Sequence, residues 1–156
     1  TPTPPRPLFT YRGAKDRAVG KRIAGFRMGF RMGYATAFYW NPVTKSWDRT
    51  IFGGPDFTAM HARISPKNVV VMWINYKGGV GVMGAEGIMV GEGRSMVMTN
   101  GRSIAGTWTR ASKQDRAIYR DAKGREIQMS PGQTWVELAA INDPVSLYPV
   151  RARTAK

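Results

Sequence analysis

The sequence predicts a mainly β protein with little helix, an antiparallel barrel or sandwich of about nine or ten short strands. Two patterns support this. Short runs of alternating apolar and polar residues recur along the chain. The chain also contains 18 glycines, which interrupt every segment that could otherwise form a long helix. The 156 residues suffice for one domain with a hydrophobic core. We expect a proline-rich arm over residues 1–15, a single β-rich domain over 16–145 and a basic tail over 146–156.

A tandem Gly-Phe-Arg-Met repeat at residues 25–32 predicts the first strand. In a helix, a glycine every four residues would cost about 1 kcal/mol each. In a strand the repeat separates cleanly into two faces. Phe26, Met28, Phe30 and Met32 share one face, and Arg27, Gly29, Arg31 and Gly33 share the other. The arginine face is either a ladder that grips phosphate or carboxylate groups or a charged edge that resists aggregation.

Several further segments have the composition of strands. Residues 34–40 and 45–52 form a hairpin around Asn41-Pro42. The β-branched and aromatic run 68–76 predicts a buried strand. Shorter strands are expected at 117–120, 125–129 and 134–138, the last with Trp135 in the core.

Residues 94–109 predict a central hairpin, because Asn100-Gly101 separates two alternating runs. The parity of the side chains favours a three-residue loop, Thr99 to Gly101. That loop gathers Met96, Met98, Ile104 and Trp108 on one face. It leaves Ser95, Ser103, Ala105, Thr107 and Thr109 on the other.

The charge of the chain predicts a polyanionic partner. Lys and Arg number 24 against 10 Asp and Glu, for a formal net charge of +14. Such a surface attracts nucleic acid, anionic lipid or an acidic wall polymer. We assign the contacts with phosphate or carboxylate groups to Arg22, Arg27, Arg31 and Arg49.

The sequence offers few residues that could form a catalytic, metal or cofactor site. The chain has no cysteine and a single histidine, His61, so we predict no metal site and no cofactor. Asp56 and His61 form a weak candidate acid–base pair, for which no nucleophile is evident. The Gly-x-Gly-x-x-Gly at 79–84 is not read as a dinucleotide site, because the glycines that follow it disfavour the required helix.

An ordered series of short motifs resembles a known family. The series comprises Phe38-Tyr-Trp-Asn-Pro-Val-Thr44, Trp47-Asp-Arg49, Gly54-Pro-Asp56, Asn68-Val-Val-Val71, Gly91-Glu-Gly93, Asn100-Gly101, Gly106-Thr-Trp108, Gly124 and Pro131-Gly-Gln-Thr-Trp135. From about Phe26 to Ile141 the chain resembles the carboxy-terminal part of the YerB-type family, bacterial proteins of unknown function described as lipoproteins.

The resemblance implies an extracytoplasmic protein, secreted or lipid-anchored, with a further domain on the amino-terminal side. It transfers no catalytic residue. Family members are expected to carry a His-x-Asp-like element where this chain has Gly54-Pro-Asp56, and the missing histidine weakens a catalytic role for Asp56.

We therefore expect a non-enzymatic, extracytoplasmic domain that binds a polyanionic or cell-envelope partner, a polymer or a membrane surface. One alternative is a hydrolase whose site is shared with the amino-terminal domain and includes Asp56 and His61. A second alternative is a nucleic-acid-binding β-domain.

Overall fold

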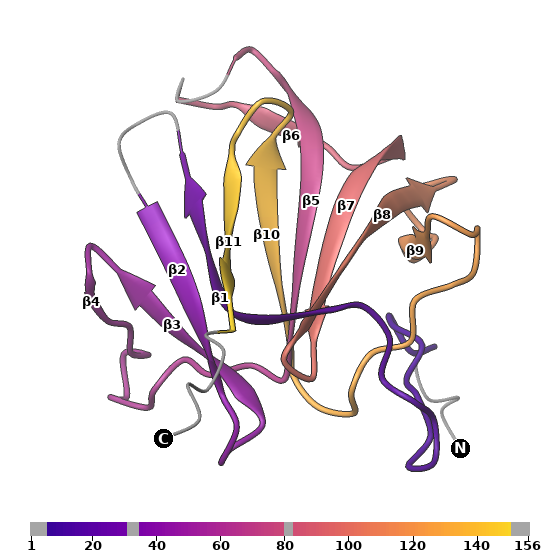
Figure 1. Cartoon of the computed structure of the whole chain (residues 1–156). Helices are drawn as coiled ribbons and strands as arrows, with labels where there is room; N and C mark the ends of the chain where they lie inside the picture. Colours follow the sequence, from indigo (N-terminus) through magenta and orange to yellow (C-terminus); the bar gives the residue numbers. More distant parts are fainter. Residues whose placement is uncertain (1–5, 31–34, 80–82, 151–156) are drawn as a thin grey trace, which may run out of the picture.

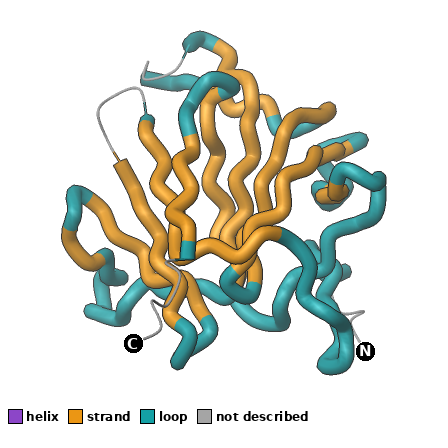
Figure 2. Tube along the Cα trace, viewed as in Figure 1, coloured by secondary structure: helices purple, strands orange, loops and turns teal. Residues whose placement is uncertain are grey.

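The computed structural model describes residues 6–30, 35–79 and 83–150, and over these residues it contains strands, turns and loops but no helix (Figure 2). Its strands form one eleven-stranded sheet in the order β10-β5-β7-β8-β1-β2-β3-β4, with β11 beside β1, β6 beside β5 and β9 beside β8. The strands are β1 Lys21–Gly29, β2 Ala35–Asn41, β3 Ser46–Ile51, β4 Gly54–Pro55, β5 Asn68–Lys77, β6 Glu86–Ile88, β7 Gly91–Thr99, β8 Arg102–Arg110, β9 Ile118–Asp121, β10 Thr134–Ala140 and β11 Val145–Pro149.

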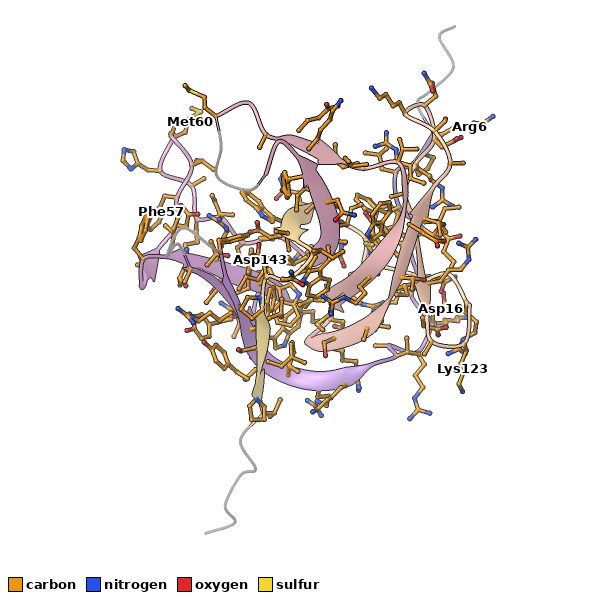
Figure 3. The ribbon with its side chains drawn as sticks, turned by 90° about the horizontal axis from the view of Figure 1, so that it is seen from above. Arg6, Asp16, Phe57, Met60, Lys123 and Asp143 are labelled. Atoms are coloured by element: carbon orange, nitrogen blue, oxygen red, sulfur yellow. The ribbon has the colours of Figure 1, made fainter. Side chains whose placement is uncertain are left out.

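The predicted fold class, mainly β, is confirmed. The sheet curls into a half-barrel (Figure 1), and side chains fill the inside of the curl (Figure 3). One pairing departs from the expected antiparallel arrangement, because β10 runs parallel to β5 from Thr134 opposite Asn68 to Ala140 opposite Ile74. The strand expected at 125–129 is reduced to isolated bridges of Glu126 and Met129.

The predicted buried strand at 68–76 is confirmed as β5, and both of its faces are covered. Val69, Val71 and Trp73 belong to the core inside the curl, together with Phe26, Phe38 and Trp47. Val70, Met72 and Ile74 belong to a second core on the opposite face, with Trp108, Tyr119 and Met129. A strand that is buried on both faces needs a continuous apolar run rather than alternation, which is what residues 69–74 supply.

The register predicted for the central hairpin is wrong. Thr99 pairs with Arg102, so β7 and β8 are joined by a two-residue turn. Asn100 and Gly101 both have positive φ, 49° and 68°, which is the type I′ conformation that Asn-Gly favours. Met96 and Met98 therefore face the core inside the curl, whereas Ile104 and Trp108 face the second core. Side-chain parity predicts the register only of a hairpin with one buried face, and this hairpin is buried on both.

A close contact fixes Trp108 above a glycine of the neighbouring strand. The Trp108 indole donates a hydrogen bond of 3.0 Å to the carbonyl of Trp73. It crosses Gly93, where an added Cβ would lie 2.6 Å from the indole nitrogen and 2.8 Å from the Trp73 carbonyl oxygen. No side chain fits at Gly93 while this hydrogen bond is present.

The repeat at 25–32 folds as predicted over its described part. Phe26 and Met28 are fully buried in β1 and Arg27 is exposed, while Arg31 and Met32 lie outside the described residues. β1 is not an edge strand, because it pairs with β2 on one side and with β11 on the other.

Both ends of the described chain pack against the sheet. Residues 145–149 form β11 and pair with β1, so the segment expected as a tail contributes a strand up to Pro149. At the other end Phe9 packs against the second core, and Tyr11 forms a bridge with Met129. In the glycine-rich connection after β5, the motif at 79–84 includes residues outside the described part, and the chain continues as β6.

The curl brings the two ends of the sheet together, and Arg49 of β3 joins them. Its guanidinium forms an ion pair with Asp56, just after β4, and a second one with Glu137 of β10 at 3.5 Å. The guanidinium carbon lies 4.8 Å from the centre of the Trp135 ring and 5.8 Å from that of Phe38. The side chain of Arg49 is only 11% exposed, so its charge is balanced inside the protein.

Burial has the largest effect on the pKa of the Glu137 carboxyl. It raises the pKa of this carboxyl above its ordinary value of 4.5, although Arg49 and the Trp135 indole, which donates a 2.9 Å hydrogen bond, both act to lower it. The folded state therefore holds the proton of this carboxyl more tightly than the unfolded state does. The associated stabilisation is complete below the ordinary pKa and is lost as the pH rises through the raised pKa.

We predict that Gly93→Ala destabilises the fold by about 1–3 kcal/mol, because the new methyl group displaces Trp108 or breaks its hydrogen bond. Gly29→Ala is the matched control, since a Cβ there meets nothing closer than 3.5 Å. It should change stability by no more than about 1 kcal/mol. Urea unfolding of both variants measures the difference, and equal stabilities would contradict the packing described for Trp108.

We predict that Glu137→Gln removes a pH-dependent cost of folding. As the pH rises from 4 to 8, the unfolding free energy of the wild type should fall relative to that of the variant, because only the wild type must ionise a buried carboxyl. Unfolding curves of both proteins across this range give the difference directly. A constant difference, or a wild type that gains on the variant, would show that Arg49 outweighs burial.

Candidate anion-binding surface

The outer face of β1, together with its neighbours β2 and β11, carries the predicted arginines Arg22 and Arg27. A β-bulge in β1 lies between Ile23, which faces Pro149, and Gly25, which faces Tyr148. The extra residue lets Ile23 and Phe26 enter the same core although three positions separate them. Arg22 and Arg27, which flank this segment, are therefore both left on the solvent side.

Two tyrosines from the strands that flank β1 stack on each other on this face. Tyr39 of β2 and Tyr148 of β11 stand on either side of Gly25 in β1. Their rings are stacked, with centroids 5.8 Å apart and planes 13° from parallel. A Cβ at Gly25 would lie 2.6 Å from the Phe38 carbonyl oxygen and about 3.2 Å from each ring, so glycine is required for the rings to close over the strand. Tyr39 remains 46% exposed.

The positive charge of this face is not neutralised. Among the described residues, the cations found in ion pairs are Arg49, Arg116 and Arg125. The side chains of Arg22 and Arg27 have no hydrogen-bond or ion-pair partner in the described part of the chain. The nearest acid in the sheet register is Asp48, opposite Tyr39, and its carboxylate accepts hydrogen bonds from Asn41 at 3.1 Å and Ser65 at 2.5 Å.

The structure separates the four predicted arginines. Arg22 and Arg27 share the outer face, and Arg31 lies outside the described residues. Arg49 points into the curl, where Asp56 and Glu137 already balance its charge. It is therefore a structural cation and is not available to an external anion.

The predicted acid–base candidates are not joined. The Asp56 carboxylate accepts a hydrogen bond from Arg49, and the backbone carbonyl of Asp56 accepts one from Arg63 at 2.9 Å. His61 lies in the following loop, is exposed and has a φ of 58°. No hydrogen bond links the two side chains in the structure as described. Asp56 thus helps to close the sheet and has no neighbouring base.

Sequence reasoning missed the tyrosine pair and Glu137. Tyr39 has a usable signal, because it alternates with the buried Phe38 and must face outward with Ala37. Tyr148 lies in the segment that was expected to be a tail. The role of Glu137 cannot be predicted from its neighbours in the sequence, because its partner Arg49 belongs to a strand far away in the chain.

Both the sequence and the fold are similar to those of known proteins. The sequence matches the C-terminal domain of the protein family of unknown function DUF3048 over residues 26–136. The fold is similar to the crystal structure of the YerB protein from Bacillus subtilis, with a TM-score of 0.68 at 11% identity. The match covers 88% of this chain and 46% of the YerB chain, so the matched part corresponds to less than half of the YerB chain.

At this level of identity, the likeness to YerB shows a shared fold and carries no functional information. No curated protein matches the sequence significantly. Among the described residues, no helix has the length and apolar character of a membrane span. The family match covers well over half of the chain and runs from within β1 to within β10. The chain belongs to the DUF3048 family, as its C-terminal domain.

Proposed function

We propose that this domain is a non-enzymatic binding module that holds a polyanionic partner of the cell envelope on the outer face of β1. Phosphate or carboxylate groups of the partner contact Arg22 and Arg27, while the exposed edge of Tyr39 packs against the polymer between them. The module acts outside the cytoplasm, alongside an amino-terminal domain of the same protein. Recovery of the native protein from the cytosolic fraction of its cells would contradict this location.

The observation that carries the proposal is the pair of exposed, unpartnered arginines on one uncovered strand face. Elsewhere, acidic side chains already form ion pairs within the chain. Asp56 and Glu137 pair with Arg49, and Asp121 and Glu126 pair with arginines of the loops. The chain has a formal net charge of +14, and Arg22 and Arg27 are exposed members of its excess of cations. A guanidinium on a rigid strand is well suited to bidentate contacts with phosphate or carboxylate oxygens.

We predict that Arg22→Ala/Arg27→Ala weakens binding to a linear polyphosphate of fixed length and lowers its salt dependence. For nucleic acids, each lost phosphate contact reduces the slope of log K against log salt concentration by about one, and a similar loss is expected here. Fluorescence anisotropy with end-labelled polyphosphate at several salt concentrations gives both quantities.

The matched control is Lys15→Ala/Lys123→Ala, which removes the same charge from two exposed loop residues. The control should bind nearly as tightly as the wild type. If both double variants lose affinity equally, the attraction is a property of net charge and the assigned face is wrong. If the wild type does not bind polyphosphate, poly(glycerol phosphate) or polyglutamate, the polyanion proposal fails.

Single-stranded nucleic acid is the second candidate, favoured by the exposed aromatic ring of Tyr39 beside Arg27. Aromatic rings on sheets stack with bases at about 1–3 kcal/mol per base. An oligothymidylate that binds much more tightly than polyphosphate of equal charge, and loses this advantage in Tyr39→Ala, would favour this candidate. Equal affinities of the two polymers would favour the envelope polymer.

A further inference from the structure

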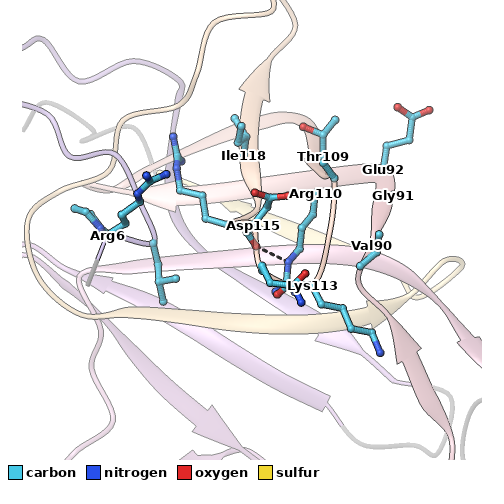
Figure 4. Close-up of a pocket in the computed structure, with 14 residues that line it drawn as sticks. Arg6, Val90, Gly91, Glu92, Thr109, Arg110, Lys113, Asp115 and Ile118 are labelled. Atoms are coloured by element: carbon cyan, nitrogen blue, oxygen red, sulfur yellow. Dashed lines mark hydrogen bonds between the residues drawn. The ribbon is translucent and has the colours of Figure 1, made fainter. Parts of the chain in front are cut away.

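A groove lies on the second-core side of the sheet, at the ends of β7 and β8 and beside β9, whereas Arg22 and Arg27 lie on β1. It has a volume of about 1200 Å³ and adjoins a smaller hollow of about 360 Å³. The two share Leu8, Arg110, Asp115 and Arg116 in their linings. In Figure 4, Arg6 of the amino-terminal segment lies on one side of the groove and Val90 to Glu92 on the other, with Arg110 between them.

The smaller hollow has an apolar floor because the cover of the second core is incomplete. Val136 and Leu138 of β10 and Met72 of β5 face this core from neighbouring strands. Phe9 and Tyr119 cover part of them, with ring centroids 6.2 Å apart. The cover ends there, and large apolar side chains stay exposed around the hollow: Leu8 is 66%, Val136 38% and Met89 37% exposed.

Tyr119 adds no charge to this floor. Its hydroxyl donates to the Met72 sulfur at 3.1 Å, and burial raises the pKa of Tyr119 to about 12. The phenol is therefore neutral at any physiological pH. A ligand that rests on the floor meets methyl groups, thioethers and aromatic carbon, which suit an alkyl chain.

The rim of the larger groove is cationic. Arg6 and Lys113 are exposed and have no ion-pair partner in the described part of the chain. Arg110 donates to the carbonyls of Asp115 at 2.7 Å and Lys113 at 2.6 Å, contacts that hold it in place without cancelling its charge. Arg116 already forms an ion pair with Glu126 at 2.7 Å.

Two acids also belong to this lining. The Asp115 carboxylate accepts a hydrogen bond from Ser112 at 2.6 Å. Glu92 lies across the groove from Arg6 (Figure 4). The unpaired cations Arg6, Arg110 and Lys113 outnumber them, so the groove favours an anionic group at its rim.

From this juxtaposition we propose that the groove binds a single-chain fatty acid. Its carboxylate lies at the rim beside Arg6 and Lys113, and its alkyl chain runs over Leu8 into the hollow lined by Met89 and Val136. The choice of ligand follows from charge complementarity at one end and exposed apolar surface at the other. A small anion would leave the floor in water, and a neutral hydrocarbon would leave the cations unused.

The test is calorimetric titration with octanoate, decanoate and dodecanoate, each below its micellar concentration. Burial of each methylene should raise affinity by up to about fourfold, so dodecanoate should bind at least several-fold more tightly than decanoate. Val136→Asp and Leu8→Asp should each lower dodecanoate affinity about tenfold or more. The matched control, Val43→Asp, alters a valine that is 88% exposed in a distant turn and should leave affinity unchanged.

The head group is tested separately. Arg6→Ala/Lys113→Ala should weaken dodecanoate binding several-fold, and dodecyltrimethylammonium, with the same chain and the opposite charge, should bind more weakly than dodecanoate. Leu8 lies outside the strands, so Leu8→Asp remains informative if Val136→Asp fails to fold. The proposal is overturned if affinity is independent of chain length, if both amphiphiles bind equally, or if Leu8→Asp behaves like the wild type. Arg22→Ala/Arg27→Ala should not alter dodecanoate binding, which separates this site from the polyanion face.

Discussion

The charge balance around Arg49 is the interaction on which the arrangement of the sheet depends. A curled sheet that does not close into a barrel has two edges, and here they approach each other with a buried guanidinium between them. Asp56 and Glu137 satisfy that charge, and the Trp135 and Phe38 rings enclose it. Removal of one partner from a buried ion pair typically costs about 3–5 kcal/mol, because the other charge is left without compensation. The half-barrel is therefore held at its opening by electrostatics as well as by its apolar interior.

This closure determines which surfaces of the sheet remain for binding. Around β5, β7 and β8 both faces are buried, one by the curl and the other by residues 6–12 and 117–129. Around β1, β2 and β11 only the inner face is buried, so Arg22 and Arg27 stay in water. Where the cover of the second core ends, apolar side chains are exposed beside Arg6 and Lys113. The two proposed binding surfaces thus arise from the two places where the sheet is uncovered.

Local patterns in the sequence predicted the strands well, but not the partners of their side chains. Phe26 and Met28 alternate with Arg27, and the rule of one buried face holds there. The same rule failed at Met96 and Trp108, because residues far away in sequence cover the second face of that hairpin. Arg49 had the appearance of a surface cation for a similar reason: Glu137 reaches it only once the sheet has curled. Contacts of this kind depend on the tertiary fold and leave no local signature.

Native-state hydrogen exchange in the wild type and in Arg49→Met tests the role of Arg49 most directly. The amides of Trp47 and Arg49 bond to the carbonyls of Pro66 and Ile64 at 2.8 and 3.0 Å, at the edge that Arg49 holds closed. Our account predicts that these two amides lose protection in the variant by a clearly larger factor than the amides of Val70 and Val97 in the β5–β7 ladder. Unchanged protection at residues 47 and 49 would contradict it, because the edge would then stay closed without the ion pairs.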